Sequence, residues 1–157
     1  MFAYCSSLIS INFANLNTEN ALDINNMFFG SSKLISINLS SFNTKNVKNM
    51  NNMFSHCKSL ISIDLSNFNT ENVEDMSYMF SDLQSLKNIN LSKFNTKKVK
   101  NMESMFNDCT SLTSLQLNFD TRSVTTMSLM FYRCLSLKYL NISKFDTRNV
   151  ENMFGMF

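Results

Sequence analysis

The fold is decided by a stretch of sequence that returns along the whole chain. Residues 34–60 read LISINLSSFNTKNVKNMNNMFSHCKSL. The Met53-Phe54 pair in this stretch has equivalents at Met1-Phe2, Met27-Phe28, Met79-Phe80, Met105-Phe106, Met130-Phe131 and Met156-Phe157. Neighbouring pairs are 26 residues apart, with one interval of 25. A fixed period of this length predicts a solenoid in which each repeat forms one coil and stacks on its neighbours.

The aligned copies place like residues in columns. All 12 methionines fall in two columns, one at the Met of Met-Phe and one three residues earlier. The other apolar columns pass through Leu60, Ile63, Leu65, Phe68 and Val73. We expect each column to become a ladder of buried side chains. The short copy has lost one residue between Leu117 and Phe119, which predicts a deletion in the turn just after a strand.

Two periodicities predict the shape of one coil. Residues 60–66 alternate apolar and polar side chains, as a half-buried strand does. Met76, Met79 and Phe80 have the i, i+3, i+4 spacing of a short helical turn, and Asp75 before them can cap its first amides. The sequence therefore predicts an α/β repeat solenoid of about six coils, each with a short parallel strand and a short helical turn. Residues 1–157 form a single domain, which we expect to be part of a longer repeat array.

The repeat resembles a known family. The pattern Leu-x-x-Ile-x-Leu-Ser-x-Phe-Asn-Thr, followed by Val-x-x-Met-x-x-Met-Phe-x-x-Cys-x-Ser-Leu, is similar to the 26-residue repeat of the BspA-like leucine-rich-repeat surface proteins. The resemblance covers the whole chain in phase. It implies a leucine-rich-repeat solenoid on the cell surface or secreted, with a role in adhesion and protein binding.

Composition excludes several classes of function. The net charge of +2 is too small to predict nucleic-acid binding, which needs a clustered basic face. The sequence contains no stretch of 18 apolar residues, so it predicts neither a transmembrane helix nor membrane insertion. Residues 1–5 lack the charged and apolar regions of a signal peptide.

Cysteine and histidine are placed unfavourably for chemistry. Cys5, Cys57, Cys109 and Cys134 share one column, in which most neighbours are two coils apart and beyond disulfide reach. We expect four free thiols that act as small apolar fillers. His56, the only histidine, stands in a column that looks exposed and variable, so neither a zinc site nor a catalytic Cys–His pair is predicted. No cofactor or metal is expected.

Function must therefore lie on the surface. The outward columns of the strand segments carry short hydroxyl and amide side chains, with one large residue, Tyr139. The candidate binding face consists of Ser36, Asn38, Ser62, Asp64, Asn88, Asn90, Ser114, Gln116, Tyr139 and Asn141. Such a face can bind a protein or a glycan through many hydrogen bonds, and it can equally be an inert solvated surface.

Charged residues form a further column, after the recurring Thr. It runs through Glu19, Lys45, Glu71, Lys97, Arg122 and Arg148. The first four alternate in sign, so we expect weak attraction between neighbouring coils there.

The sequence predicts a non-catalytic interaction or adhesion module. The alternatives are an intracellular leucine-rich-repeat scaffold and an enzyme, and the pattern offers an enzyme no convergent titratable groups. The apolar ladders of the last coil, which include Leu137 and Leu140, have no further coil above them in this chain. End-to-end self-association is therefore a further expectation.

Overall fold

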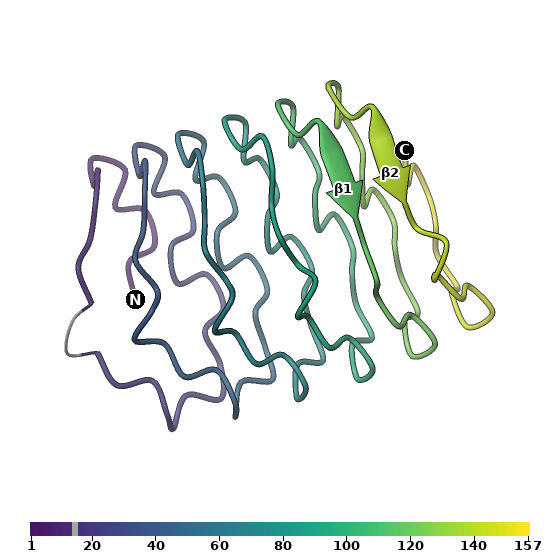
Figure 1. Ribbon diagram of the computed structural model, residues 1–157, viewed down its shortest axis with the longest axis horizontal. Helices are drawn as coiled ribbons and strands as arrows, with labels where there is room; N and C mark the ends of the chain where they lie inside the picture. The colour runs from purple at the N-terminus through teal and green to yellow at the C-terminus, as the bar shows by residue number, and fades with distance from the viewer. Residues whose placement is uncertain (14–15) are drawn as a thin grey trace.

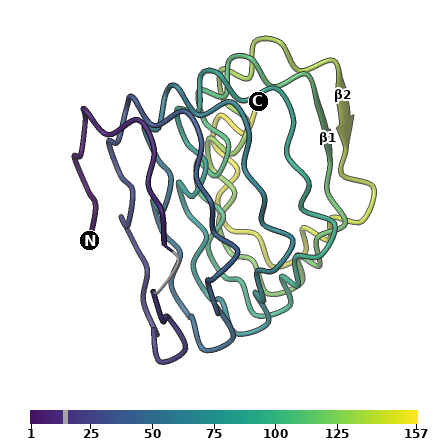
Figure 2. The ribbon, with the colours of Figure 1, turned by 60° about the vertical axis from the view of Figure 1, so that its left-hand side comes forward.

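The chain winds into a row of stacked coils. The computed structural model describes residues 1–13 and 16–157. The coils follow one another along a single long axis, with the two chain termini in the outermost coils (Figure 1). The view turned by 60° shows the coils stacked one behind another (Figure 2). The predicted repeat solenoid is therefore the observed architecture.

Parallel pairing joins neighbouring coils at equivalent positions. Single bridges link the column that precedes the Met-rich segment: Asp23 with Asn49, Asn49 with Asp75, Asp75 with Asn101, Asn101 with Thr126, and Thr126 with Asn152. The partners are 26 residues apart, or 25 across the short copy. The sequence period is thus the length of one turn of the solenoid.

Strands are fewer than the sequence predicts. β1 (Ser114–Gln116) and β2 (Tyr139–Asn141) form a two-stranded parallel sheet in which Leu115 lies opposite Leu140. Equivalent segments of the earlier coils carry single bonds, such as Ile35 N to Ile9 O at 3.0 Å, and form no assigned strand among the described residues. The prediction of a short strand in each coil is confirmed for these two coils alone.

The α/β detail is not confirmed, because no helix is assigned in the described part of the chain. The predicted helical turn is a succession of tight turns. Met53 N donates to Met50 O at 3.2 Å and Cys57 N donates to Phe54 O at 3.1 Å. The third residue of each turn, Asn52 or His56, has a positive φ of 55° or 62°, as a type II turn requires.

The remaining amides of this segment bond to the next coil, which explains why no helix forms. Met50 N, Asn52 N and Phe54 N donate to Asp75 O, Ser77 O and Met79 O at 3.0, 3.0 and 3.1 Å. A helix would use these amides internally. In this segment, turn bonds within the coil alternate with hydrogen bonds to the neighbouring coil. Every second amide therefore donates to a neighbouring coil, and these bonds hold the stack together.

The interior consists of the predicted ladders. Phe28, Phe54, Phe80 and Phe106 are fully buried. Their rings stack nearly parallel, with successive centroids 5.6, 6.0 and 5.6 Å apart. The predicted burial of the apolar columns is confirmed in the middle coils, whereas Leu137 and Leu140 of the last coil are half-buried.

The invariant threonines bridge the coils. Thr70 Oγ1 donates to Asn95 O at 3.0 Å and accepts from Asn95 N at 2.8 Å. Thr18, Thr44 and Thr121 make the same pair of bonds to the coil that follows. Because all four are buried, these bonds replace the backbone pairing that a regular sheet would provide.

Coil 5 (residues 105–129, when each coil is counted from its Met-Phe pair) is shortened where the sequence predicts. The turn that closes after the strand segment, as in Phe94 N to Leu91 O at 3.0 Å, has no counterpart between Leu117 and Phe119. Leu117 N instead donates to Asn141 O of coil 6 at 3.1 Å. The lost turn thus lets the β1–β2 ladder extend by one bond.

Candidate interaction surface

All ten residues of the predicted binding face are exposed. They lie on one side of the solenoid because they alternate with the buried Leu and Ile columns. Another exposed column on this side was missed in the sequence. It runs through Ile9, Ile35 and Ile61, with exposed fractions of 59, 43 and 57%, and continues as Lys87, Thr113 and Lys138. The recurrence of Ile one residue before the Ser column was the available signal.

The Asn/Asp column of this face has a structural role. Asn38, Asp64, Asn90 and Asn141 each accept a bond through Oδ1 from the amide two residues later, at 2.9–3.0 Å. These bonds shape the turn that leaves the strand segment. The Ser66 amide also lowers the pKa of the Asp64 carboxyl. In the three asparagines, the side-chain NH₂ group can therefore still donate hydrogen bonds to a ligand.

Gln116 departs from this pattern. It lies in coil 5, where the turn is missing, and its side chain makes no hydrogen bond to the described residues. Both ends of its amide are therefore available to a ligand. Gln116 thus differs from the asparagines of this column, because both the oxygen and the nitrogen of its amide are free of hydrogen bonds to the described residues.

A shallow hollow lies over the two strands. It has a volume of about 470 Å³ and is lined by Ser114, Leu115, Gln116, Lys138, Tyr139, Leu140 and Asn141. Four residues of the predicted face, Ser114, Gln116, Tyr139 and Asn141, are brought together here. Tyr139 is 75% exposed. A smaller hollow of about 50 Å³ contains Asp64 and Asn90, and the other four predicted residues line none of these hollows.

A third hollow opens at the edge of coils 5 and 6, beyond the strands. It measures about 400 Å³ and is lined by Asn118, Phe119, Asp120, Arg122, Lys144 and Asp146. Arg122 binds Asp120 through Nε and Nη2 at 2.9 and 2.6 Å. These hydrogen bonds lower the pKa of Asp120 to about 2. Arg148 holds Asp146 in the same way, at 2.7 Å.

The sequence predicts attraction between neighbouring coils in the charge column to which Arg122 and Arg148 belong, but the structure shows no ion pairs of this kind among the described residues. Arg122 and Arg148 bind carboxylates of their own coils. The ion pair between neighbouring coils on this side is Lys100 Nζ with Glu74 Oε2 at 2.7 Å. Its two residues belong to a column three positions later.

His56 belongs to a polar cluster, so its column is less exposed than predicted. Its Nδ1 lies 2.6 Å from Asp82 Oδ2, and Lys58 Nζ and Gln84 Nε2 also contact this carboxylate at 3.2 and 2.8 Å. Burial opposes ionisation of Asp82, but the three hydrogen bonds outweigh it and lower its pKa. Asp82 is buried, and the cluster ties coil 3 to coil 4.

The cysteine column is internal and its thiols are free. Cys57 Sγ donates to Phe28 O at 3.2 Å, and Cys109 and Cys134 make equivalent bonds at 3.0 and 3.1 Å. Burial raises the pKa of Cys57 to about 12 and that of Cys134 to about 11. A thiol that stays protonated at neutral pH is a poor nucleophile and metal ligand. The described residues contain no group of three or more potential metal-binding side chains.

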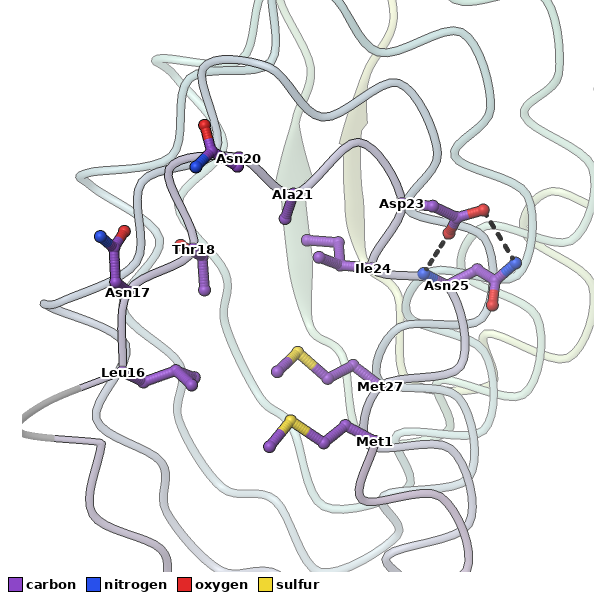
Figure 3. Close-up of a pocket in the computed structure, with 10 residues that line it drawn as sticks. All are labelled: Met1, Leu16, Asn17, Thr18, Asn20, Ala21, Asp23, Ile24, Asn25 and Met27. Carbon is purple, nitrogen blue, oxygen red and sulfur yellow. Dashed lines mark hydrogen bonds between the residues drawn. The ribbon is translucent and has the colours of Figure 1, made fainter.

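The N-terminal end of the solenoid carries an apolar hollow of about 390 Å³ (Figure 3). Met1, Leu16 and Ile24 of the first coil and Met27 of the second extend toward it. On its rim, Asp23 binds the backbone and side-chain nitrogens of Asn25 at 2.8 and 3.3 Å. The hollow lies beside the first side chains of the interior ladders.

Comparison with known proteins assigns the chain to a family. It belongs to the family described as "Mycoplasma protein of unknown function, DUF285", whose model matches residues 1–116 and 83–157. A search of curated proteins finds no match. Among solved structures, it is similar to a leucine-rich repeat protein from Bacteroides ovatus, with 17% identity and a TM-score of 0.42. The similarity covers 96% of this chain and 43% of that protein. Among the described residues, no helix could cross a membrane.

Proposed function

We propose that this chain is a non-catalytic interaction module of the BspA-like leucine-rich-repeat type, which binds a protein partner across its strand face. The observation that carries the proposal is the hollow over β1 and β2, whose lining includes both an exposed Tyr139 and the unengaged amide of Gln116. Tyrosine is enriched among the residues that dominate binding energy at protein interfaces. The half-buried Leu140 of the hollow, together with Ser114 and Lys138, would supply apolar contact and a polar rim.

The module would act in adhesion at the cell surface. This location follows from the family resemblance of the repeat, and the alternative is an intracellular scaffold. Labelling intact cells with an antibody against the chain distinguishes the two, because a surface module is labelled without permeabilisation. Labelling that appears only after permeabilisation would support the scaffold.

A binding screen with two matched variants tests the proposed face. The purified chain is applied to an array of proteins and glycans, and each bound partner is measured again with Tyr139→Ala and Tyr132→Ala. Tyr132 is exposed too, but it lies outside the strand face. We expect Tyr139→Ala to weaken protein binding about 30-fold, as loss of an aromatic anchor does, and Tyr132→Ala to leave it unchanged. Equal effects of the two variants would contradict the assignment of the face.

A further inference from the structure

The cations of coils 4–6 gather along one edge of the solenoid. This basic edge consists of the exposed residues Lys93, Lys97, Lys98, Arg122, Lys144 and Arg148, all in the turns that follow the strand segments. The only acids in the same turns are Asp120 and Asp146, each held by an arginine of its own coil. In coils 1–3 the described residues of these turns carry Glu19, Lys45 and Glu71 instead. The edge is therefore strongly positive in one half of the molecule and not in the other.

The deletion in coil 5 shapes this edge. Lys93 and Lys144 occupy the same column in coils 4 and 6, and the residue that would lie between them is the one missing from coil 5. At the spacing of stacked parallel segments the two lysines stand roughly 10 Å apart. The hollow of about 400 Å³ beside Asn118 and Lys144 lies at this gap. The gap left by the missing residue thus forms a notch in the basic edge, and cations flank this notch.

Several of these cations are positioned by neighbouring coils. Lys98 Nζ donates to Asn72 Oδ1 at 2.7 Å and Lys93 Nζ donates to Ser66 O at 3.3 Å. Lys97 acts on Asp120, where it contributes to the lowered pKa of that carboxyl. The carbonyl and amide oxygens that bind Lys93 and Lys98 carry no net charge, so these contacts are not ion pairs. A polyanion would gain from all four lysines together.

We propose that the basic edge binds an acidic polysaccharide, one that carries sulfate or carboxylate groups along its chain. The turns of this edge offer a peptide no free backbone edge for strand addition, because their amides are occupied. For example, Lys97 N donates to Asn95 Oδ1 and Val99 N donates to Thr96 O. The exposed neighbours are hydroxyl and amide side chains, such as Ser92, Asn118 and Ser123, which can exchange hydrogen bonds with sugar hydroxyls. This site is separate from Tyr139 and does not depend on the strand-face proposal.

The test measures binding to heparin, which carries sulfates, and to polygalacturonate, which carries carboxylates. The variant Lys93→Gln/Lys97→Gln/Lys98→Gln/Lys144→Gln removes four charges from the edge. The control Lys33→Gln/Lys45→Gln/Lys48→Gln/Lys87→Gln removes four exposed charges elsewhere and has the same net charge. We expect affinity for at least one polymer to fall about 10-fold or more in the edge variant and less than about 2-fold in the control. Wild-type affinity should fall between roughly 50 and 200 mM NaCl.

A second pair of variants tests the notch itself. Asn118→Glu places a negative charge in the notch, whereas Asn88→Glu places the same charge on the strand face. We expect Asn118→Glu to weaken binding about 3-fold more than Asn88→Glu does. The proposal is overturned if neither polymer binds at low salt, or if both members of either variant pair lose affinity equally. Binding of poly-glutamate as tight as that of the glycans would point to a peptide ligand and would also overturn it.

Discussion

At the level of single residues, the threonine column shows that recurrence in the sequence does not reveal which role a side chain has. The sequence shows Thr18, Thr44, Thr70, Thr96, Thr121 and Thr147 as a recurring column. A periodic residue can be repeated for its local bonds or for bonds between coils, and both give the same pattern. The structure resolves this in favour of the second, because the hydroxyl of Thr70 satisfies both backbone groups of Asn95 in the following coil.

Replacing Thr70 by Val should therefore destabilise the solenoid by about 2–5 kcal/mol. Valine has nearly the same shape, but it leaves the part-buried hydrogen bonds of the Asn95 amide and carbonyl without their partner. Thr70→Ser keeps the hydroxyl and should cost about 1 kcal/mol. Urea unfolding monitored by circular dichroism gives both values. Equal losses from Val and Ser would mean that the methyl group, and not the bridge, is what matters.

The buried thiols make stability depend on pH in the alkaline range. The pKa of Cys57 rises from an ordinary value of 9.0 to about 12, so the unfolded chain loses this proton before the folded chain does. The contribution of the neutral thiol is complete below pH 9 and is lost as pH rises toward 12. We expect the urea midpoint of the wild type to fall between about pH 8 and about pH 10.5.

The matched variant is Cys57→Ser, since Ser31 in the same column makes the equivalent bond to Phe2 O at 3.0 Å. Serine does not titrate in this range, so the fall in midpoint should be smaller in Cys57→Ser than in the wild type. Identical pH profiles would show that other groups, such as the lysines and tyrosines, account for the whole effect.

At the scale of the element, the Met-rich segment explains why the sequence suggests a helix that is not there. Apolar residues at i, i+3 and i+4 face one side of a helix, and successive three-residue turns bring the same positions to one side. Asp75 accepts from Ser77 N at 2.8 Å, as an N-cap would, although no helix follows. The feature that decides against a helix is the inter-coil bonding of alternate amides, which depends on neighbouring coils and is invisible in one repeat.

Substitutions at Asn52 distinguish a turn from a helix. Asn52 has φ of 55°, a conformation that glycine adopts freely and alanine adopts at a cost of about 1 kcal/mol. We expect Asn52→Gly to be at least as stable as the wild type, and Asn52→Ala to be less stable than Asn52→Gly by about 1 kcal/mol. A helix would give the opposite order, because alanine is the better helix former. Chemical unfolding of the two variants determines the sign.

At the scale of the whole molecule, the repeat predicts the interior well and the surface less well. Buried columns follow from periodicity because each apolar residue meets its own equivalent in the next coil, as the stacked rings of Phe54 and Phe80 do. The surface at coil 5 departs from the repeat, and the effect of this departure depends on the neighbouring coils. The missing residue in coil 5 could be located in the sequence, but the hollows beside Gln116 and Asn118 could not.

The two halves of the chain differ in charge, whereas the hollows at both ends of the solenoid are alike in containing apolar side chains. Residues 1–92 contain five Lys or Arg against seven acids, and residues 93–157 contain nine against five. The N-terminal hollow is lined largely by apolar side chains such as Ile24 and Met27, and a hollow of about 360 Å³ at the other end is lined by Phe131, Leu137, Leu140 and Phe157 among others. Stacking one copy on another would cover apolar surface and bring an acidic half against a basic one.

We therefore expect copies of this chain to associate end to end, with an apparent mass in light scattering that rises with concentration. Phe157→Lys places a charge on the C-terminal hollow and should shift the rise to higher concentration. Phe154→Lys is the matched control: Phe154 and Phe157 are 75 and 72% exposed, but only Phe157 lines the hollow. Since both side chains are exposed, neither substitution should change the melting temperature much. A constant monomer mass in the wild type at high concentration would contradict end-to-end association, and equal effects of the two variants would place the contact elsewhere.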